Sequence, residues 1–175
     1  MTKATPEKDW ILVMNFGEPE HVTMLRESIR RMLDKHASRG QMAEWDELDK
    51  VPRSLMDEIT ALGVCGLTVH EEYGGLGRDI LATMVTVEEL SRRSMVIATL
   101  YLMNACYGSM NIHASGSEAQ KSRLLPDLAE GKLLFAYGLS EPDVGSDLAS
   151  VRTRAERNGD TVTINGSKRW CSGAE

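Results

Sequence analysis

Apolar residues recur every three or four positions along much of the first 132 residues, which is the spacing of one helical face. The first such pattern lies in residues 20–38 and is made by Val22, Leu25, Ile29, Met32 and Leu33. A second helix is predicted from Pro52, a favoured first helical position, to Gly63, a natural C-terminal cap. Both segments are therefore expected to bury one apolar face in a common core.

Three more helices are predicted before the pattern changes. One begins after Asp79, a good N-cap residue. Its apolar side is formed by Leu81, Met84, Val85 and Leu90. The segment after Ser94 is apolar nearly all round, which predicts a buried central helix, and it is too short and interrupted to span a membrane. Ser117 opens a capping box, and the helix that follows is expected to restart at Pro126 and end at Gly131.

Beyond residue 132 the hydrophobic period changes from about 3.6 to two, which is typical of strands. Residues 133–140 form an apolar run, and residues 151–172 alternate around two Asn-Gly pairs that favour hairpin turns. We expect these segments to form an antiparallel sheet. The predicted fold class is α+β: an all-α helical domain at residues 1–132 and the start of an antiparallel β domain at residues 133–175. So few strands cannot cover a sheet face, so this domain is expected to be incomplete.

Composition and charge argue against several classes of function. Of the 175 residues 42% are apolar, and 20 basic against 26 acidic side chains give a net charge of −6, which argues against nucleic acid as a partner. The N-terminus carries no export or transit pattern, so we expect a cytoplasmic protein. The odd count of 3 cysteines argues against a disulfide framework, and each is expected to be a small buried residue. The 4 histidines show no metal-ligand spacing, so no metal is predicted.

One loop stands out chemically. GLSEPDVGSD, residues 138–147, combines glycines, serines, a proline and three acids directly after an apolar run. Pro142 fixes one backbone angle, and Gly145 is expected to give the bend a backbone path closed to other residues. The loop is either a rigid connection with capping hydroxyls or a surface whose backbone N–H groups meet a phosphate or a polar ring edge. Composition alone favours the rigid connection.

A longer motif favours the second interpretation of this loop, a binding surface. The run F-A-Y-G-L-S-E-P-D-V-G-S-D is followed, some twenty residues later, by N-G-S-K-R-W-C-S-G, and the pair resembles the motifs of the acyl-CoA dehydrogenase family. Upstream, E-E-Y-G-G-L-G at residues 71–77 resembles a loop of the same family. Members have a helical domain, a middle β domain and a C-terminal four-helix bundle. The resemblance therefore implies the first domain and the start of the second.

The resemblance also implies a cofactor, FAD, and the residues that hold it. Tyr137, Leu139 and Ser140 match the segment that meets the flavin ring, where donors at the ring edge stabilise the charge of the reduced form. Gly145 and Ser146 match positions at the FAD pyrophosphate, and Ser146 also matches a position at the pantetheine arm of the substrate. The loop is thereby expected to be a binding surface.

Three other positions are interpreted in the same way. Trp170 matches a tryptophan packed on the flavin, and Ser172 matches a hydroxyl near its N5. Glu141 matches a loop-supporting glutamate and is assigned a structural role. Met103 and Tyr107, four residues apart on the predicted central helix, either pack in the core or line an acyl pocket, and the pattern alone favours the core.

The implied reaction is the oxidation of an acyl-CoA thioester to trans-2-enoyl-CoA, with the electrons passing to an electron-transferring flavoprotein or a similar acceptor, in a homo- or hetero-oligomer. The family's catalytic glutamate lies in the C-terminal bundle, so the catalytic residue of this protein is unknown. Two alternatives remain open: a non-catalytic interaction subunit, or a related flavoenzyme such as a nitroalkane oxidase or a flavin monooxygenase. The chain alone is expected to bind FAD weakly or not at all and to turn over no acyl-CoA.

Overall fold

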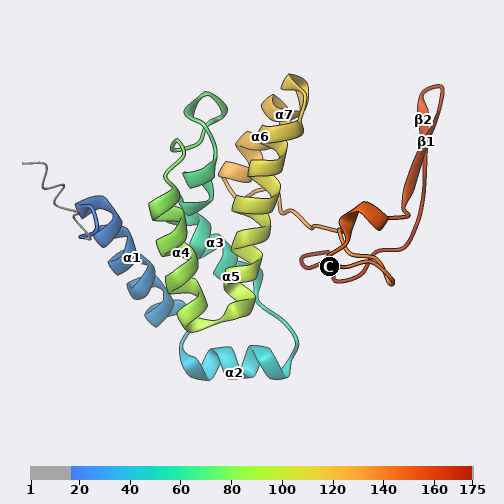
Figure 1. Cartoon of the computed structure of the whole chain (residues 1–175). Coiled ribbons are helices and arrows are strands. Elements are labelled where there is room, and N and C mark those ends of the chain that lie inside the picture. Colours follow the sequence, from blue (N-terminus) through green and yellow to red (C-terminus); the bar gives the residue numbers. More distant parts are fainter. Residues whose placement is uncertain (1–16, 175) are drawn as a thin grey trace, which may run out of the picture.

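The computed structural model describes residues 17–174, which form a bundle of helices followed by an extended β part (Figure 1). The α-helices are α1 (Glu20–His36), α2 (Arg39–Glu47), α3 (Arg53–Ala61), α4 (Ile80–Arg93), α5 (Met95–Leu102), α6 (Asn111–Ser115) and α7 (Glu118–Ala129). Short 3-10 turns are η1 (Val64–Thr68), η2 (Glu71–Tyr73) and η4 (Leu148–Ser150), and η3 (Met103–Met110) is a π-helix that continues α5 into α6. The strands are β1 (Arg154–Asn158) and β2 (Thr161–Asn165).

The bundle core confirms most of the predicted helical faces. Helix α1 buries four of its five predicted apolar residues, and Leu25 packs at the edge of the same core. Asp79 caps α4 by accepting a hydrogen bond from the Ala82 N–H at 2.9 Å, and Ser117 forms the predicted capping box on α7. Gly63 lies in the left-handed region with φ 75°, just after α3. These boundaries follow from local chemistry, because each cap satisfies backbone groups that a helix end leaves free.

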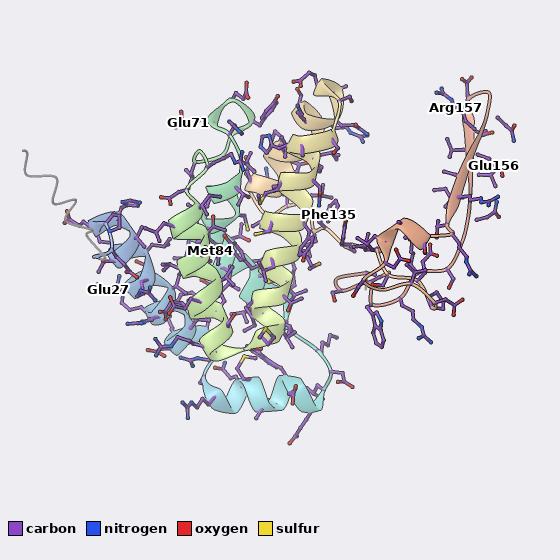
Figure 2. The ribbon with its side chains drawn as sticks, viewed as in Figure 1. Glu27, Glu71, Met84, Phe135, Glu156 and Arg157 are labelled. Carbon is purple, nitrogen blue, oxygen red and sulfur yellow. The ribbon has the colours of Figure 1, made fainter. Side chains whose placement is uncertain are left out.

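One helix was missed, and two helical predictions were wrong in part. Helix α2 was not predicted, although Ser38 and Gln41 form a capping box at its start. Pro126 restarts nothing, because α7 runs through it without a break. On α4 the inward face is centred one position later than expected, so Leu81 and Met84 are exposed to solvent; Figure 2 labels Met84 on this helix.

The central helix is buried on one side only. Ile97, Ala98, Tyr101 and Ala105 lie in the core, whereas Met95 and Val96 are exposed, so the predicted central helix is buried along one face although its sequence is apolar nearly all round. The π-helical stretch η3 turns a new set of side chains outward, because i→i+5 bonding widens the turn. Tyr107 is among them. This stretch faces the β part and helps to form the site described below.

The β part differs from the expected sheet. Strands β1 and β2 form one antiparallel hairpin, with Asn158 opposite Thr161 and Gly159 in its turn at φ 61°. Residues 133–140 form no strand, and the second Asn-Gly pair, at Asn165, leads into irregular chain. The reason is that a strand needs a paired ladder, and within residues 17–174 the amides of residues 134–140 find no acceptor.

A close helix contact seats the start of the β part. Phe135, labelled in Figure 2, packs on η3 at Gly108, where an added Cβ would lie 2.9 Å from the Phe135 side chain. A larger residue at position 108 would push the connection away. Among the described residues no helix has the length and apolar character needed to cross a membrane, and no cluster of three metal-ligating side chains occurs. Cys65 is buried as expected, but Cys106 and Cys171 are only partly so.

Candidate functional site

A hollow of about 170 Å³ lies where η3 meets the β part. It is lined by Met103, Tyr107, Tyr137, Leu139, Ser140, Arg169, Trp170 and Ser172. Five of these residues are among the seven predicted to contact a cofactor, and they come from two loops some thirty residues apart in sequence. The fold therefore brings both halves of the motif to one surface of the helical bundle.

Backbone and lysine contacts hold the two loops side by side. The Arg169 N–H donates to the Ser140 carbonyl at 2.9 Å, and Lys168 Nζ donates to the Leu139 carbonyl at 3.0 Å. Gly138 lies so close that an added Cβ would be 3.2 Å from Cys171 Sγ. The loops thus face each other across a fixed spacing, and that spacing sets the width of the hollow.

Aromatic rings form the wall next to the helix. The Tyr107 and Tyr137 ring centroids are 5.2 Å apart, and Tyr137 also stacks on Phe135 at 6.5 Å. Such distances are typical of favourable aromatic pairs. Tyr107 is 41% exposed and Met103 is partly exposed, so both line the hollow instead of filling the core, and the core interpretation was wrong.

Trp170 has two unusual features. Its side chain is 80% exposed, and its backbone has φ 60°, a left-handed conformation that is uncommon for residues other than glycine. The Arg169 guanidinium lies 6.0 Å from its ring centroid. Exposing a large apolar ring is costly in water unless another surface covers it. The strained backbone and the open ring together mark Trp170 as a contact surface.

The remaining polar groups of the hollow are free to bind. Within residues 17–174 the hydroxyls of Ser140 and Ser172 form no hydrogen bond, and neither do the amides of Leu139 and Ser140. A flat aromatic ring with polar edges would find an indole face, a tyrosine wall and several hydrogen-bonding groups here. The residues present therefore fit one face and one edge of an isoalloxazine ring.

Glu141 braces the loop from beneath. It is 8% exposed and accepts hydrogen bonds from the Thr153 hydroxyl at 2.5 Å and from the backbone N–H groups of Arg152 and Thr153, each at 2.8 Å. Lys168 Nζ adds a contact at 3.1 Å. The Thr153 hydroxyl, then these amides and Lys168, lower the pKa of Glu141 to about 2. A carboxylate held in this way stays charged and positions the loop.

Gly145 and Ser146 lie outside the hollow, on the exposed side of the loop. They follow a tight turn closed by reciprocal backbone bonds between Glu141 and Val144, at 2.9 and 3.2 Å. Gly145 has no positive φ, and an added Cβ would meet nothing within 4 Å. The expectation that the bend itself requires this glycine was therefore wrong, because its own conformation suits any residue.

Sequence reasoning missed Lys168 and Arg169. Lys168 joins Leu139 to Glu141, and Arg169 lines the hollow beside Trp170. Their place within the N-G-S-K-R-W run was the available signal, but their partners lie about thirty residues away in sequence. Only the three-dimensional arrangement shows which carbonyl each one meets.

Comparison with known families identifies the class of protein. Residues 19–132 match the family model of the acyl-CoA dehydrogenase N-terminal domain, and residues 136–175 match that of the acyl-CoA dehydrogenase middle domain. Together these matches cover most of the chain. The chain belongs to the acyl-CoA dehydrogenase family.

Individual members of this family are similar to the chain in sequence and in structure. The chain is 36% identical over 162 residues to (2S)-methylsuccinyl-CoA dehydrogenase of Cereibacter sphaeroides, a match that covers 90% of this chain and 29% of that protein. A solved glutaryl-coenzyme A dehydrogenase in complex with glutaryl-CoA matches with a TM-score of 0.83 and 32% identity, covering 90% of this chain and 40% of that one. A glutaryl-CoA dehydrogenase of Mycobacterium smegmatis in complex with FADH2 matches with a TM-score of 0.80 and 29% identity, covering 87% and 39%. The chain thus spans 29% to 40% of the length of these relatives.

Proposed function

We propose that this chain supplies a flavin-binding and acyl-binding surface of an FAD-dependent acyl-CoA dehydrogenase, which oxidises acyl-CoA thioesters to trans-2-enoyl-CoA. The observation that carries the proposal is the hollow that gathers five motif residues, among them the exposed Trp170. Family membership supports it, and so do a structural relative in complex with FADH2 and another in complex with glutaryl-CoA.

The five motif residues of the hollow each have a role in this proposal. Trp170 stacks on one face of the flavin ring, and Tyr137 forms part of the aromatic wall next to η3. The hydroxyls of Ser140 and Ser172 and the free amide of Leu139 hydrogen-bond the ring edge. FAD, when bound, supplies the acceptor for the hydride that leaves the β-carbon of the acyl group. The chain's own groups fix the orientation that such a transfer needs.

Proton abstraction is a task for another group. No carboxylate lines the hollow among the described residues, and Glu141 is held beneath the loop as a permanently charged brace. Removal of the α-proton requires a base within hydrogen-bond reach of the acyl α-carbon. The contribution of this chain to the chemistry is therefore binding and orientation.

Other residues of this chain contact the FAD pyrophosphate and the substrate. Gly145 and Ser146 lie at the FAD pyrophosphate, and Ser146 also contacts the pantetheine arm; the open space over Gly145 supports a close approach there. Met103 and Tyr107 line the acyl end of the site from η3. By resemblance to the family, the electron acceptor is an electron-transferring flavoprotein or a similar protein, and the enzyme is an oligomer in the cytoplasm.

The test is to map two ligands on the chain by NMR. FAD should shift the Trp170 indole signal and the Leu139 and Ser140 amides. Butyryl-CoA should shift the Met103 methyl signal, whereas free CoA, the matched control, should not, because only the acyl group reaches η3. If neither FAD nor butyryl-CoA perturbs the hollow at millimolar concentration, the proposed function is wrong.

A further inference from the structure

A second and larger hollow, of about 360 Å³, lies between the loop around η2 and the adjoining helices α6 and α7. It shares no lining residue with the first hollow. Its walls carry two histidines, a tyrosine, an arginine and a lysine, with one glutamate among them. Nothing in the proposed function uses these groups.

Ring contacts join the two sides of this hollow. The His70 and His113 ring centroids are 4.6 Å apart, and the Tyr73 ring lies 5.5 Å from that of His113. The His70 backbone N–H donates to His113 Nε2 at 3.3 Å. Neutral His113 must therefore carry its proton on Nδ1. Among residues 17–174 this Nδ1–H has no acceptor, so it is a free donor.

The positive groups are only partly neutralised. Lys121 gives one of its three donors to Glu118 at 2.9 Å, and Glu118 also accepts from the Tyr73 hydroxyl at 2.8 Å. Arg78 forms no ion pair or hydrogen bond with any described residue. Glu72 is the single carboxylate in the lining.

The direction in which the pKa of His113 is shifted shows that positive charge predominates around its ring. Burial lowers the pKa of His113 first, and the positive charges of His70, Arg78 and Lys121 lower it further. Glu72 acts in the opposite direction and does not reverse the shift. The imidazole therefore experiences a net positive surrounding, which an anion would relieve.

We propose that this hollow binds a small oxyanion, the phosphate or carboxylate group of a metabolite, through the Arg78 guanidinium, Lys121 Nζ and the His113 Nδ1–H. An arginine fork and a lysine suit such groups, because both donate charge-assisted hydrogen bonds to several oxygens. The volume leaves room for more than the anion itself. The Tyr73 and His70 rings provide an aromatic surface for the rest of the molecule.

The proposal carries a pH dependence with a definite sign. Protonation of His113 adds positive charge, so the anion should bind more tightly as the pH falls through the pKa of His113, which lies below its usual value. Other charged groups that face these rings are Glu72 and Arg78 on the loop side and Glu118 and Lys121 on α7. Because coupling is reciprocal, the bound anion must raise the pKa of His113.

The experiment follows the histidine C2–H signals of the 175-residue chain by NMR. Inorganic phosphate is titrated against sodium chloride at constant ionic strength, and a second arm adds acetate to ask whether a carboxylate competes. We expect saturable shifts of His70 and His113 and a rise of about 0.5 to 1 in the pKa of His113, which corresponds to a roughly three- to tenfold preference of the anion for the protonated form. Competition by acetate assigns a carboxylate-tolerant site, and its absence assigns a phosphate site.

Two variants decide whether the shifts are specific. Arg78→Gln should weaken phosphate binding at least about fivefold, since it removes an unpaired guanidinium. Arg31→Gln is the matched control, because Arg31 is a 71% exposed arginine on α1 outside the hollow. Non-saturating shifts, an equal pKa of His113 in phosphate and chloride, or equal binding by the two variants would overturn the proposal.

Discussion

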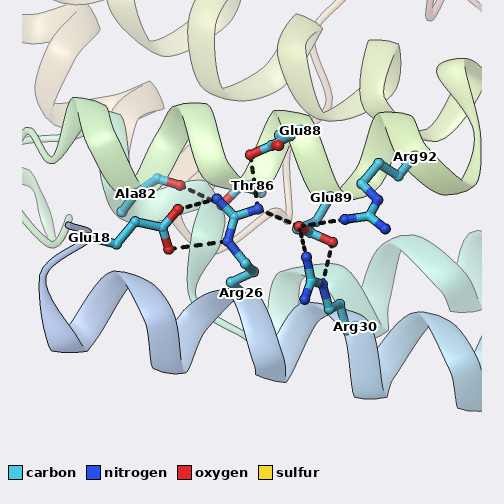
Figure 3. A network of polar contacts seen from close by, with 8 residues as sticks. All are labelled: Glu18, Arg26, Arg30, Ala82, Thr86, Glu88, Glu89 and Arg92. Atoms are coloured by element: carbon cyan, nitrogen blue, oxygen red, sulfur yellow. Dashed lines mark hydrogen bonds and ion pairs between the residues drawn. The ribbon is translucent and has the colours of Figure 1, made fainter. Parts of the chain in front are cut away.

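Replacing Glu89 by glutamine should be among the most damaging conservative changes in the helical bundle. The Glu89 side chain is 2% exposed, and three arginines point at its carboxylate from α1 and α4 (Figure 3). Arg30 donates to both carboxylate oxygens at 2.8 Å, and Arg26 donates to Oε1. Arg92 lies at 3.6 Å. Glutamine keeps the shape but removes the charge and turns one acceptor into a donor that faces a guanidinium.

The expected cost follows from the number and exposure of these contacts. Hydrogen bonds to charged groups contribute about 1.5–3 kcal/mol each, and breaking a buried pair on one side costs about 3–5 kcal/mol. Arg30 and Arg92 are half exposed and can recover water, which reduces the loss. We therefore expect Glu89→Gln to lower the free energy of unfolding by about 3 kcal/mol. With a urea m-value of about 2 kcal/mol/M, the midpoint should fall by roughly 1.5 M.

The matched control is Glu88→Gln, one residue away on the same helix. Glu88 is 56% exposed and meets Arg26 alone, at 2.9 Å, so its loss should cost less than about 1 kcal/mol. Urea unfolding followed by circular dichroism measures both variants against the parent chain.

The dependence of stability on pH in the acid range gives a second test of the role of Glu89. Burial raises the pKa of Glu89, but hydrogen bonds from Arg30 and Arg26 outweigh it, so the pKa lies below the usual value. The charged form therefore stabilises the fold above the ordinary glutamate pKa, and that stabilisation is lost as the pH falls through the lower, folded value. The gap between parent and Glu89→Gln should narrow in that range. Equal costs for the two variants, or a gap independent of pH in acid, would refute this reasoning.

Three further changes probe the cap, the core and the loop brace. Ser117→Ala should destabilise the chain by about 1 kcal/mol in thermal unfolding, because α7 loses its capping box; an unchanged Tm would contradict this. Tyr101→Phe should cost about 1 kcal/mol in urea, because the buried Val64 carbonyl loses its 3.1 Å partner, and a neutral effect would count against that bond. Glu141→Gln should speed hydrogen exchange at the amide of residue 153, because that amide loses its carboxylate acceptor. In the parent chain the same amide should stay protected down to about pH 2, near the pKa of Glu141. Equal exchange in the two chains at neutral pH would show that Glu141 is not needed to hold the loop.

Local chemistry made the helical part predictable. Asp79 and Ser117 act as caps through contacts within three residues, so sequence alone could place these helix ends. The faces of helices were harder. On α4 the pattern predicted Leu81 and Met84 on the inward face, but packing against α1 and α5 turns the neighbouring positions inward.

The β part and the site depend on distant contacts. An alternating pattern indicates that residues can form a strand, but residues 133–140 lack a ladder partner within the described chain. The motif resemblance named five of the eight residues that line the hollow. It could not show that Trp170 adopts a left-handed backbone, or that Tyr107 stands out from η3 beside Tyr137. Those features arise where two separate loops meet a π-helix.

The central claim is that Trp170 stacks on a flavin ring, and the affinity of the chain for FAD with and without that side chain tests it most directly. Stacking of about 1–3 kcal/mol and one or two hydrogen bonds of about 1 kcal/mol each predict a dissociation constant of roughly 1 mM, since the hollow covers one face of the ring. Trp170→Ala should weaken binding about tenfold or more, whereas Trp45→Phe on α2, outside the hollow, should leave it unchanged. Equal FAD affinity in the parent chain and Trp170→Ala would contradict the account.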